Sequence, residues 1–213
     1  DFCLSRGLGD VYKRQLIMSI DSLSVPLHQA VKTLKEAPDG LYYALLYQGG
    51  MTCFDKEIEK YLPVRFDRPL KLKEIHDFCW YDGNLYLATS KGLFESHPIR
   101  KKEGKDDFVL CTLNPEPLIK GKVANLCTDG KTNLYFSVDR EKVMHYDFVT
   151  KKSALIREYN VVNRLFLRQG YLWICRLWND IVCYDLKTHK ERVISLEGGD
   201  QSDFSNSYVT DMV

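Results

Sequence analysis

The sequence lacks the features that define most membrane, zinc-binding and disulfide-stapled proteins. No stretch approaches the roughly 20 consecutive apolar residues that a membrane helix needs. Seven cysteines and five histidines are present, but no C-x-x-C occurs and the histidines stand singly. We therefore predict no metal site and no cofactor. Five cysteines lie in apolar or strand-like runs and are expected to be small buried hydrophobes: Cys53, Cys79, Cys127, Cys175 and Cys183.

An excess of one charge is also missing. Lys plus Arg number 30 and Asp plus Glu number 29, so the net charge is +1. This balance gives no electrostatic basis for binding nucleic acid or an anionic membrane. The one dense basic run, residues 100–105, is followed by two aspartates and is expected to be a solvated loop. Phosphate-binding glycine loops and the G-x-S-x-G and H-E-x-x-H motifs are absent, so we predict that the chain is not an enzyme.

Long helical periodicity is scarce, and short period-two alternation takes its place. Residues 28–37, "HQAVKTLKEA", are ambiguous between helix and strand. Their place in the repeat described next favours a strand.

What the sequence does contain is a unit that occurs four times. Each copy places Leu, an aromatic residue, a large apolar residue and a small residue in a row, starting at Leu41, Leu85, Leu134 and Leu172, which are 44, 49 and 38 residues apart. A glycine turn signal comes just before each copy, and an apolar pair three residues apart lies further upstream. Downstream, an aromatic residue precedes an acid, and this recurrence indicates a structural role in turns for Asp55, Glu95, Asp147 and Asp185.

A four-stranded unit that repeats every 40 to 50 residues or so is typical of a β-propeller blade. We predict an all-β fold, namely a β-propeller fragment with about four four-stranded antiparallel blades and the first strand of a fifth. The expected blades are residues 30–70, 71–118, 119–157 and 158–205, with the next blade starting at 206–213. A β-sandwich would not repeat five separate features at this period. Such a fragment is expected to form an open arc.

Residues 1–15 match nothing in the repeat. They resemble the translated adapter scar found at the ends of reading frames assembled from metagenomic reads. We therefore expect residues 1–15 to be a non-native or disordered leader and residues 16–213 to form the partial propeller.

The repeated unit resembles the two-component regulator propeller repeat. That repeat has an apolar first strand, an Asp-Gly turn, a Leu-Trp-Ile-Gly-Thr-like strand, then Gly-Leu and an aromatic residue followed by Asp. The second copy matches best, with Asp82-Gly83, residues 85–89 and Gly92-Leu93-Phe94. The other copies depart from the pattern at the threonine position, where Leu45, Val138 and Arg176 stand.

The resemblance implies a function that composition and spacing do not show. Propellers of that family usually form the periplasmic sensor part of membrane-spanning hybrid histidine kinases, often in gut Bacteroidetes, and many sense oligosaccharides. The resemblance therefore implies a non-catalytic, ligand-sensing, periplasmic segment. Its implied partners are a glycan or other small ligand, the remaining blades, and a kinase portion of the same polypeptide. The alternative is a scaffold for protein–protein interaction, as other propellers provide.

Three aromatic residues beside turns are candidates for ligand binding: Trp80, Tyr81 and Trp178. Flat aromatic faces suit sugar rings, and propellers bind ligands at the mouth of the channel or on one face. The structural alternative is that these side chains pack between blades or cover blade edges. Both interpretations stay open at the level of the sequence.

Overall fold

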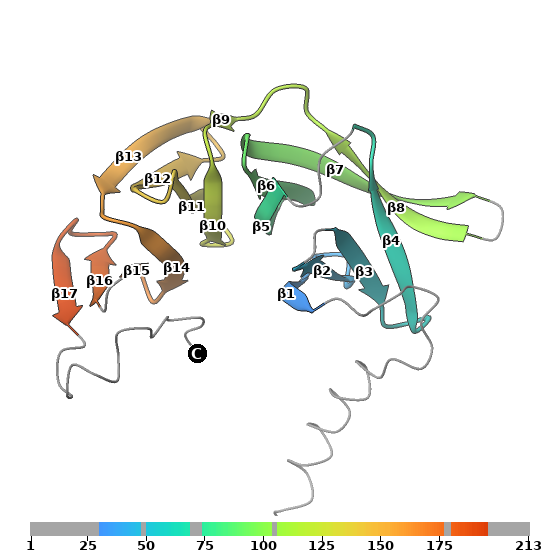
Figure 1. Ribbon diagram of the computed structural model, residues 1–213, viewed down its shortest axis with the longest axis horizontal. Helices are drawn as coiled ribbons and strands as arrows, with labels where there is room; N and C mark the ends of the chain where they lie inside the picture. The colour runs from blue at the N-terminus through green and yellow to red at the C-terminus, as the bar shows by residue number, and fades with distance from the viewer. Residues whose placement is uncertain (1–29, 48–49, 69–73, 104–105, 177–179, 196–213) are drawn as a thin grey trace, which may run out of the picture.

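The computed structural model describes residues 30–47, 50–68, 74–103, 106–176 and 180–195 (Figure 1). These residues form strands and turns with no α-helix, so the all-β prediction is confirmed. None of them belongs to a helix that could span a membrane. The predicted leader at 1–15 and the predicted start of a further blade at 206–213 lie outside the described residues.

Consecutive strands group into four antiparallel units of four, which we call blades 1 to 4. Blade 1 comprises β1 (Val31–Glu36), β2 (Tyr42–Leu46), β3 (Met51–Asp55) and β4 (Lys60–Phe66), and blade 2 comprises β5 (Ile75–Tyr81), β6 (Asn84–Thr89), β7 (Gly92–Glu103) and β8 (Asp106–Leu113). Blade 3 comprises β10 (Val123–Thr128), β11 (Asn133–Val138), β12 (Lys142–Asp147) and β13 (Lys152–Glu158), and blade 4 comprises β14 (Val162–Arg168), β15 (Tyr171–Arg176), β16 (Asp180–Asp185) and β17 (Glu191–Ser195). The short strand β9 (Ile119–Lys120) pairs with β7.

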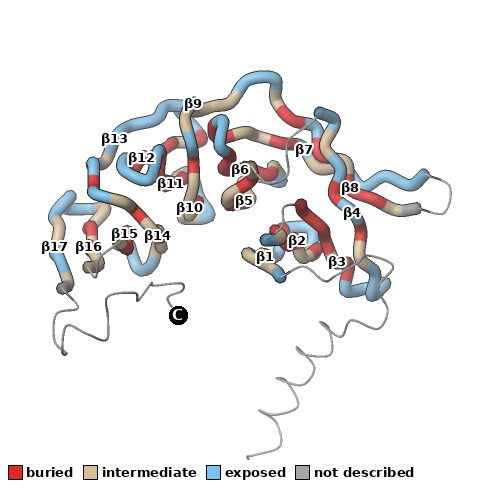
Figure 2. The backbone as a smooth tube through the Cα atoms, in the orientation of Figure 1, coloured by how far each residue is buried: buried red, intermediate tan, exposed pale blue. Residues whose placement is uncertain are grey.

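The four blades follow one another around an arc, with the first strand of each blade on the inside (Figure 1). We call β1, β5, β10 and β14 the inner strands. In blades 2, 3 and 4 the second strand, β6, β11 or β15, is the most buried, whereas the outer strand β13 is mostly exposed (Figure 2). The ambiguous segment at 28–37 contains β1, so its prediction as a strand is confirmed for Val31–Glu36.

The repeated aromatic residue occupies one structural position on the second strands. Tyr86, Tyr135 and Trp173 lie opposite Cys79, Cys127 and Phe166 of their inner strands. Tyr86 and Tyr135 are buried, each against the blade that follows, and Trp173 is half-buried. The sequence pattern therefore identified equivalent residues in blades 2, 3 and 4.

Blade 1 departs from the expected alignment by one residue. Tyr43 pairs with Lys35 just as Tyr86 pairs with Cys79, so Tyr43, and not Tyr42, is the equivalent of Tyr86. The connection between β1 and β2 spans residues 37–41, which is longer than the tight turn between β5 and β6. Because side chains alternate between the two faces of a strand, this offset of one residue exchanges the faces. The alignment of the first copy on Leu41 was wrong for this reason.

Side chains alternate between the two faces of each second strand, and apolar residues occur on both faces. Each blade can therefore pack against a neighbour on either side. In blade 2, Leu85 and Leu87 pack in a cluster with blade 1, while Tyr86 and Ala88 pack in a cluster with blade 3. A third cluster joins blades 3 and 4. A blade alone would expose both apolar faces, so the repeat is required for burial.

The outer edges of blades 1 and 2 are joined, which the sequence did not predict. Strand β4 pairs in parallel with β8, with Val64 opposite Val109. The basic run at 100–105 was predicted to be a loop, but Arg100–Glu103 continue strand β7. The Arg100 guanidinium lies 2.7 Å from the Asp55 carboxylate of blade 1, and this ion pair helps to hold the extended hairpin against that blade.

Gly92, in the Gly-Leu-aromatic part of the repeat, is required by a close backbone approach. A Cβ atom there would lie 2.2 Å from the Ile119 carbonyl oxygen, and the φ angle of Gly92 is +149°. Strand β9 pairs with β7 at this point, so the chain leaving blade 2 passes over a residue that has no side chain.

The cysteines behave as small hydrophobes in part. Cys53, Cys79 and Cys175 are buried as predicted, whereas Cys127 and Cys183 are half-buried. None of the described cysteines forms a disulfide. Burial raises the pKa of Cys53 and of Cys79 to about 12, so both thiols stay protonated at neutral pH.

We predict that Phe136→Ala lowers the free energy of unfolding by about 3–5 kcal/mol, because it leaves a cavity between blades 2 and 3. Phe136 is fully buried in that cluster. Val149→Ala removes an apolar side chain that is 69% exposed and should change stability by no more than about 0.5 kcal/mol. Urea unfolding at constant pH measures both. Equal effects of the two substitutions would show that the clusters between blades do not hold the arc together.

Candidate functional site

Of the four acids that recur once per blade, Asp55, Asp147 and Asp185 accept hydrogen bonds from turn N–H groups, as predicted. Glu95 does not: it accepts hydrogen bonds from the side chains of Asn84, Tyr86 and Asn114. Asp147 Oδ1 accepts hydrogen bonds from the backbone N–H groups of Val149 and Thr150, at 2.8 and 3.0 Å. Asp185 does the same for Lys187 and Thr188. These contacts give the carboxylates of Asp147 and Asp185 a structural role at the outer turns.

A different set of side chains surrounds a pocket at the centre of the arc. The pocket has a volume of about 390 Å³ and is lined by all four inner strands. Its lining consists of residues 32–35 of β1, Asp77 of β5, residues 125–127 of β10 and residues 164–168 of β14. The four blades converge at this pocket, and most of the residues that line it are polar or charged.

A β-bulge in each inner strand aims polar side chains into this pocket. The strand register shifts between Val31 and Thr33 and at the equivalent places in β5, β10 and β14. A bulge redirects a side chain that regular pleating would point elsewhere. In β10 the bulge includes Asn125, whose φ of +57° is tolerated by asparagine better than by most residues.

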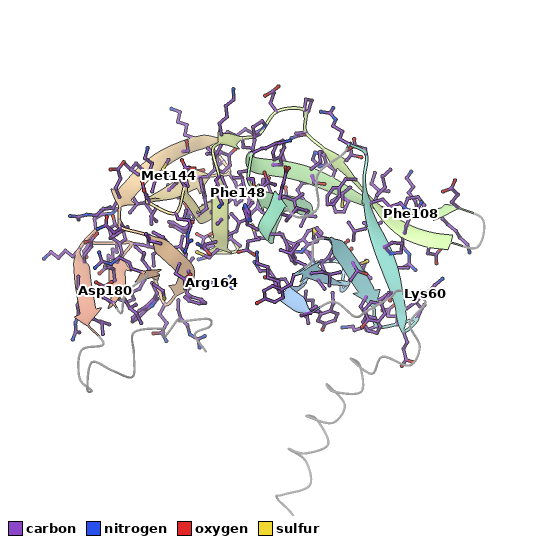
Figure 3. All side chains as sticks on the ribbon, viewed as in Figure 1. Lys60, Phe108, Met144, Phe148, Arg164 and Asp180 are labelled. Carbon is purple, nitrogen blue, oxygen red and sulfur yellow. The ribbon has the colours of Figure 1, made fainter. Side chains whose placement is uncertain are left out.

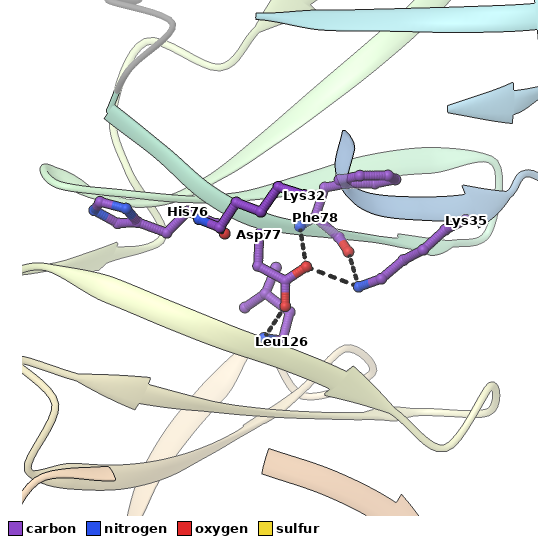
Figure 4. A network of polar contacts seen from close by, with 6 residues as sticks. All are labelled: Lys32, Lys35, His76, Asp77, Phe78 and Leu126. Atoms are coloured by element: carbon purple, nitrogen blue, oxygen red, sulfur yellow. Dashed lines mark hydrogen bonds and ion pairs between the residues drawn. The ribbon is translucent and has the colours of Figure 1, made fainter. Parts of the chain in front are cut away.

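Asp77 is the most highly connected residue of the pocket (Figure 4). Its Oδ1 atom accepts hydrogen bonds from the Phe78 backbone N–H at 2.8 Å and from the Lys35 ammonium group at 2.9 Å. Its Oδ2 atom accepts a hydrogen bond from the backbone N–H of Leu126 at 2.8 Å. Lys35 belongs to blade 1, Asp77 to blade 2 and Leu126 to blade 3. One carboxylate therefore ties three blades together beside the pocket.

The remaining charges of the pocket are positive. Lys32 Nζ donates a hydrogen bond to the His76 carbonyl oxygen at 2.8 Å. Burial lowers the pKa of Lys32, the negative charge of Asp77 opposes this shift, and the positive charge of Arg164 adds to it. Arg164 is half-buried at the inner rim of the arc (Figure 3). Arg168 is exposed on the same strand, β14.

The aromatic candidates lie in the interfaces between blades. Trp80 packs against the cluster shared with blade 1, with its ring centre 4.8 Å from that of Tyr43. Tyr81, on the opposite face of β5, stacks on Phe148 of blade 3 at 3.7 Å. Neither lines the central pocket, and Trp178 lies outside the described residues. A ligand-binding role for these three residues stays a prediction.

Sequence reasoning missed the pocket, although a signal for it is present. In every copy of the repeat a polar residue stands two positions after the first member of the upstream apolar pair, namely Thr33, Asp77, Asn125 and Arg164. All four line the pocket. The chemistry of this position differs from copy to copy, so the position does not stand out in a repeat defined by similar residues. In the part of the chain that the structure describes, no three potential metal ligands gather.

The fold and the central pocket define the chain as a β-propeller. No family model and no curated protein matches its sequence. Among solved structures it is similar to the extracellular domain of a one-component system from Bacteroides thetaiotaomicron, with a TM-score of 0.63 and 11% identity over 83% of this chain and 26% of that one. It is also similar to the extracellular domain of a hybrid two-component system of the same organism, with a TM-score of 0.57 and 14% identity over 81% and 24%.

A third similar structure is an auxiliary nutrient-binding protein of B. thetaiotaomicron, with a TM-score of 0.57 and 16% identity over 80% of this chain and 43% of that one. The chain thus spans less than half of the length of each of these proteins. At such identities the likeness establishes the fold. The proteins that share this fold include the extracellular domains of a one-component system and of a hybrid two-component system, in agreement with the resemblance noted in the repeat.

We predict that Lys35 and Asp77 are energetically coupled, because their ion pair is largely shielded from water and shares a carboxylate with two backbone donors. A double-mutant cycle with Lys35→Met and Asp77→Asn should give a coupling free energy of about 1–3 kcal/mol in urea unfolding. The matched control is the pair Lys142 and Glu158, which is exposed and 3.9 Å apart. Its coupling should stay below about 0.5 kcal/mol. Similar coupling in both cycles would contradict the special role of Asp77.

We also predict that Asp147 and Asp185 contribute to acid sensitivity. Hydrogen bonds from the backbone N–H of Thr150 and of Thr188, respectively, are the main reason why the pKa of each lies below its ordinary value of 3.8. Their contribution to stability is therefore complete above that value and is lost as the pH falls through the lower pKa of the folded state. The double variant Asp147→Asn, Asp185→Asn should lose less stability than the parent between about pH 4 and pH 2.

Urea unfolding at a series of pH values measures this difference. Glu141→Gln, at an exposed turn, is the control and should keep the steep acid dependence of the parent. An unchanged slope in the double variant would mean that other carboxylates carry the effect.

Proposed function

We propose that this chain is a non-catalytic, ligand-sensing segment of a β-propeller from a two-component regulator, and that its ligand binds in the central pocket. The ligand of this proposal is an oligosaccharide, and the signal passes to a histidine kinase outside this chain. The location that goes with this role is the periplasm. The observation that carries the proposal is the pocket itself, since every blade contributes polar side chains to it.

The architecture supports a sensing role. A ligand that contacts β1, β5, β10 and β14 touches all four blades, so binding can alter how the blades sit against one another. The volume of about 390 Å³ lies within the range of small-molecule sites, roughly 300–1,000 Å³. The similar structures add support, because they include extracellular domains of one-component and two-component systems and a nutrient-binding protein.

The chemistry of the pocket supports binding without turnover. General acid–base catalysis needs a group that can exchange a proton with the substrate. The carboxylate among the described lining residues is that of Asp77, and both of its oxygens already accept hydrogen bonds from within the protein. This arrangement favours a structural carboxylate over a general acid or base.

The proposal predicts that Thr33→Trp abolishes saccharide binding by filling the pocket. Thr33 is a half-buried lining residue on β1. The control is Thr112→Trp, which places the same side chain at an exposed position of β8. Binding is measured by calorimetric titration of the 213-residue chain with oligosaccharides prepared from plant and host polysaccharides, and chromatography of the same mixtures detects any product.

The expected result is that at least one oligosaccharide binds the parent and Thr112→Trp, fails to bind Thr33→Trp, and is recovered unchanged. Binding that survives in Thr33→Trp would place the site elsewhere on the propeller. Saccharide cleavage would contradict the non-catalytic role. Absence of binding to every saccharide, together with capture of a defined protein partner, would favour the interaction scaffold.

A further inference from the structure

We propose that the central pocket recognises an anionic group, a carboxylate or a sulfate carried by an acidic saccharide, through Lys32, Arg164 and Arg168. This inference deepens the proposed function and rests on it for the saccharide part of the ligand. The anion-binding part stands on the pocket alone.

The first argument is the distribution of charge. Four cationic side chains line the pocket, Lys32 and Lys35 on β1 and Arg164 and Arg168 on β14. The described lining contains one carboxylate, that of Asp77. The whole chain has a net charge of only +1, so this local excess is a property of the pocket and not of the overall composition.

The second argument is that the Asp77 carboxylate already has partners within the protein. Its carboxylate neutralises Lys35 at 2.9 Å and accepts two backbone hydrogen bonds. Several arginines elsewhere on the described blades have acidic partners, as in Arg100 with Asp55 and Arg157 with Glu191. The ion pairs of the described part of the chain include none for Lys32, Arg164 or Arg168.

The third argument is the repulsion between like charges in the pocket. Lys32 is half-buried, and the positive charge of Arg164 lies close enough to help lower its pKa. Like charges that are partly removed from water destabilise each other more than they do in bulk water. A bound anion would relieve this repulsion, so the positively charged lining of the pocket is complementary to negative charge.

The geometry also suits an anionic sugar. A guanidinium group presents a planar fork that can donate two parallel hydrogen bonds to a carboxylate or a sulfate. The cations lie on β1 and β14, whereas Thr33 and Asn125 add neutral polar groups to the same lining. A ligand with one acidic group and several hydroxyls can use both kinds of contact.

The test uses three probes on the 213-residue chain at constant ionic strength: inorganic sulfate, trigalacturonate, and the methyl ester of trigalacturonate. The ester keeps the sugar skeleton but removes the negative charge. Calorimetric titration and thermal melting, with chloride as the reference salt, measure binding. We expect sulfate and trigalacturonate to bind with saturation, and the ester to bind roughly tenfold more weakly or not at all.

Arg164→Gln should weaken binding of both anions by about tenfold or more, because it removes a charged donor from the pocket. Arg192→Gln makes the same change on the exposed face of β17 and should leave binding unchanged. Lys32→Gln is the second pocket variant and serves if Arg164→Gln does not fold.

The outcomes separate the two proposals. Sulfate binding that depends on Arg164, without saccharide binding, supports the anion site and counts against the saccharide ligand. Equal binding of acid and ester, unaffected by Arg164→Gln, overturns the anion site and leaves the sensing proposal intact. Lack of binding by both sulfate and trigalacturonate, or anion binding that both arginine variants retain, overturns the inference.

Discussion

A single buried carboxylate links the first three blades of this propeller. Asp77 is nearly inaccessible to water, and it is stabilised by the Lys35 ammonium group and by two backbone N–H groups, one of them from Leu126. Removing one partner from such a buried pair typically costs about 3–5 kcal/mol, because the other charge is left uncompensated. At the centre of the arc, this one side chain thus connects blades 1, 2 and 3, in addition to the apolar clusters between them.

The pocket follows from the same constraint. The bulges that let Asp77 reach its partners recur in the other inner strands and turn Thr33, Asn125 and Arg164 toward the same space. In β5, β10 and β14 the apolar residues on either side of the bulge pack between blades, so one short segment per repeat supplies both core contacts and pocket lining. In β1 the equivalent Leu34 is exposed. A ligand in this pocket would lie next to Lys35, Asp77 and Leu126, whose contacts connect the blades.

The apolar repeat made the fold predictable, since burial between blades demands similar residues in every copy. Its period and turns predicted four blades, and Tyr86, Tyr135 and Trp173 were identified as equivalents. The one-residue offset of Tyr43 relative to the other copies and the pairing of β4 with β8 were not predicted. Turn length and edge pairing do not recur with the repeat, so the repeat does not reveal them. The pocket was missed for the opposite reason: its residues share a position but differ in chemistry.

Hydrogen–deuterium exchange of the 213-residue chain, with and without a bound acidic saccharide or sulfate, tests most directly whether the centre of the arc is the binding site. The account predicts that binding slows exchange in the inner strands β1, β5, β10 and β14, including the Leu126 amide that donates to Asp77. Protection confined to outer strands such as β13 and β17, with unchanged exchange at Leu126, would contradict it.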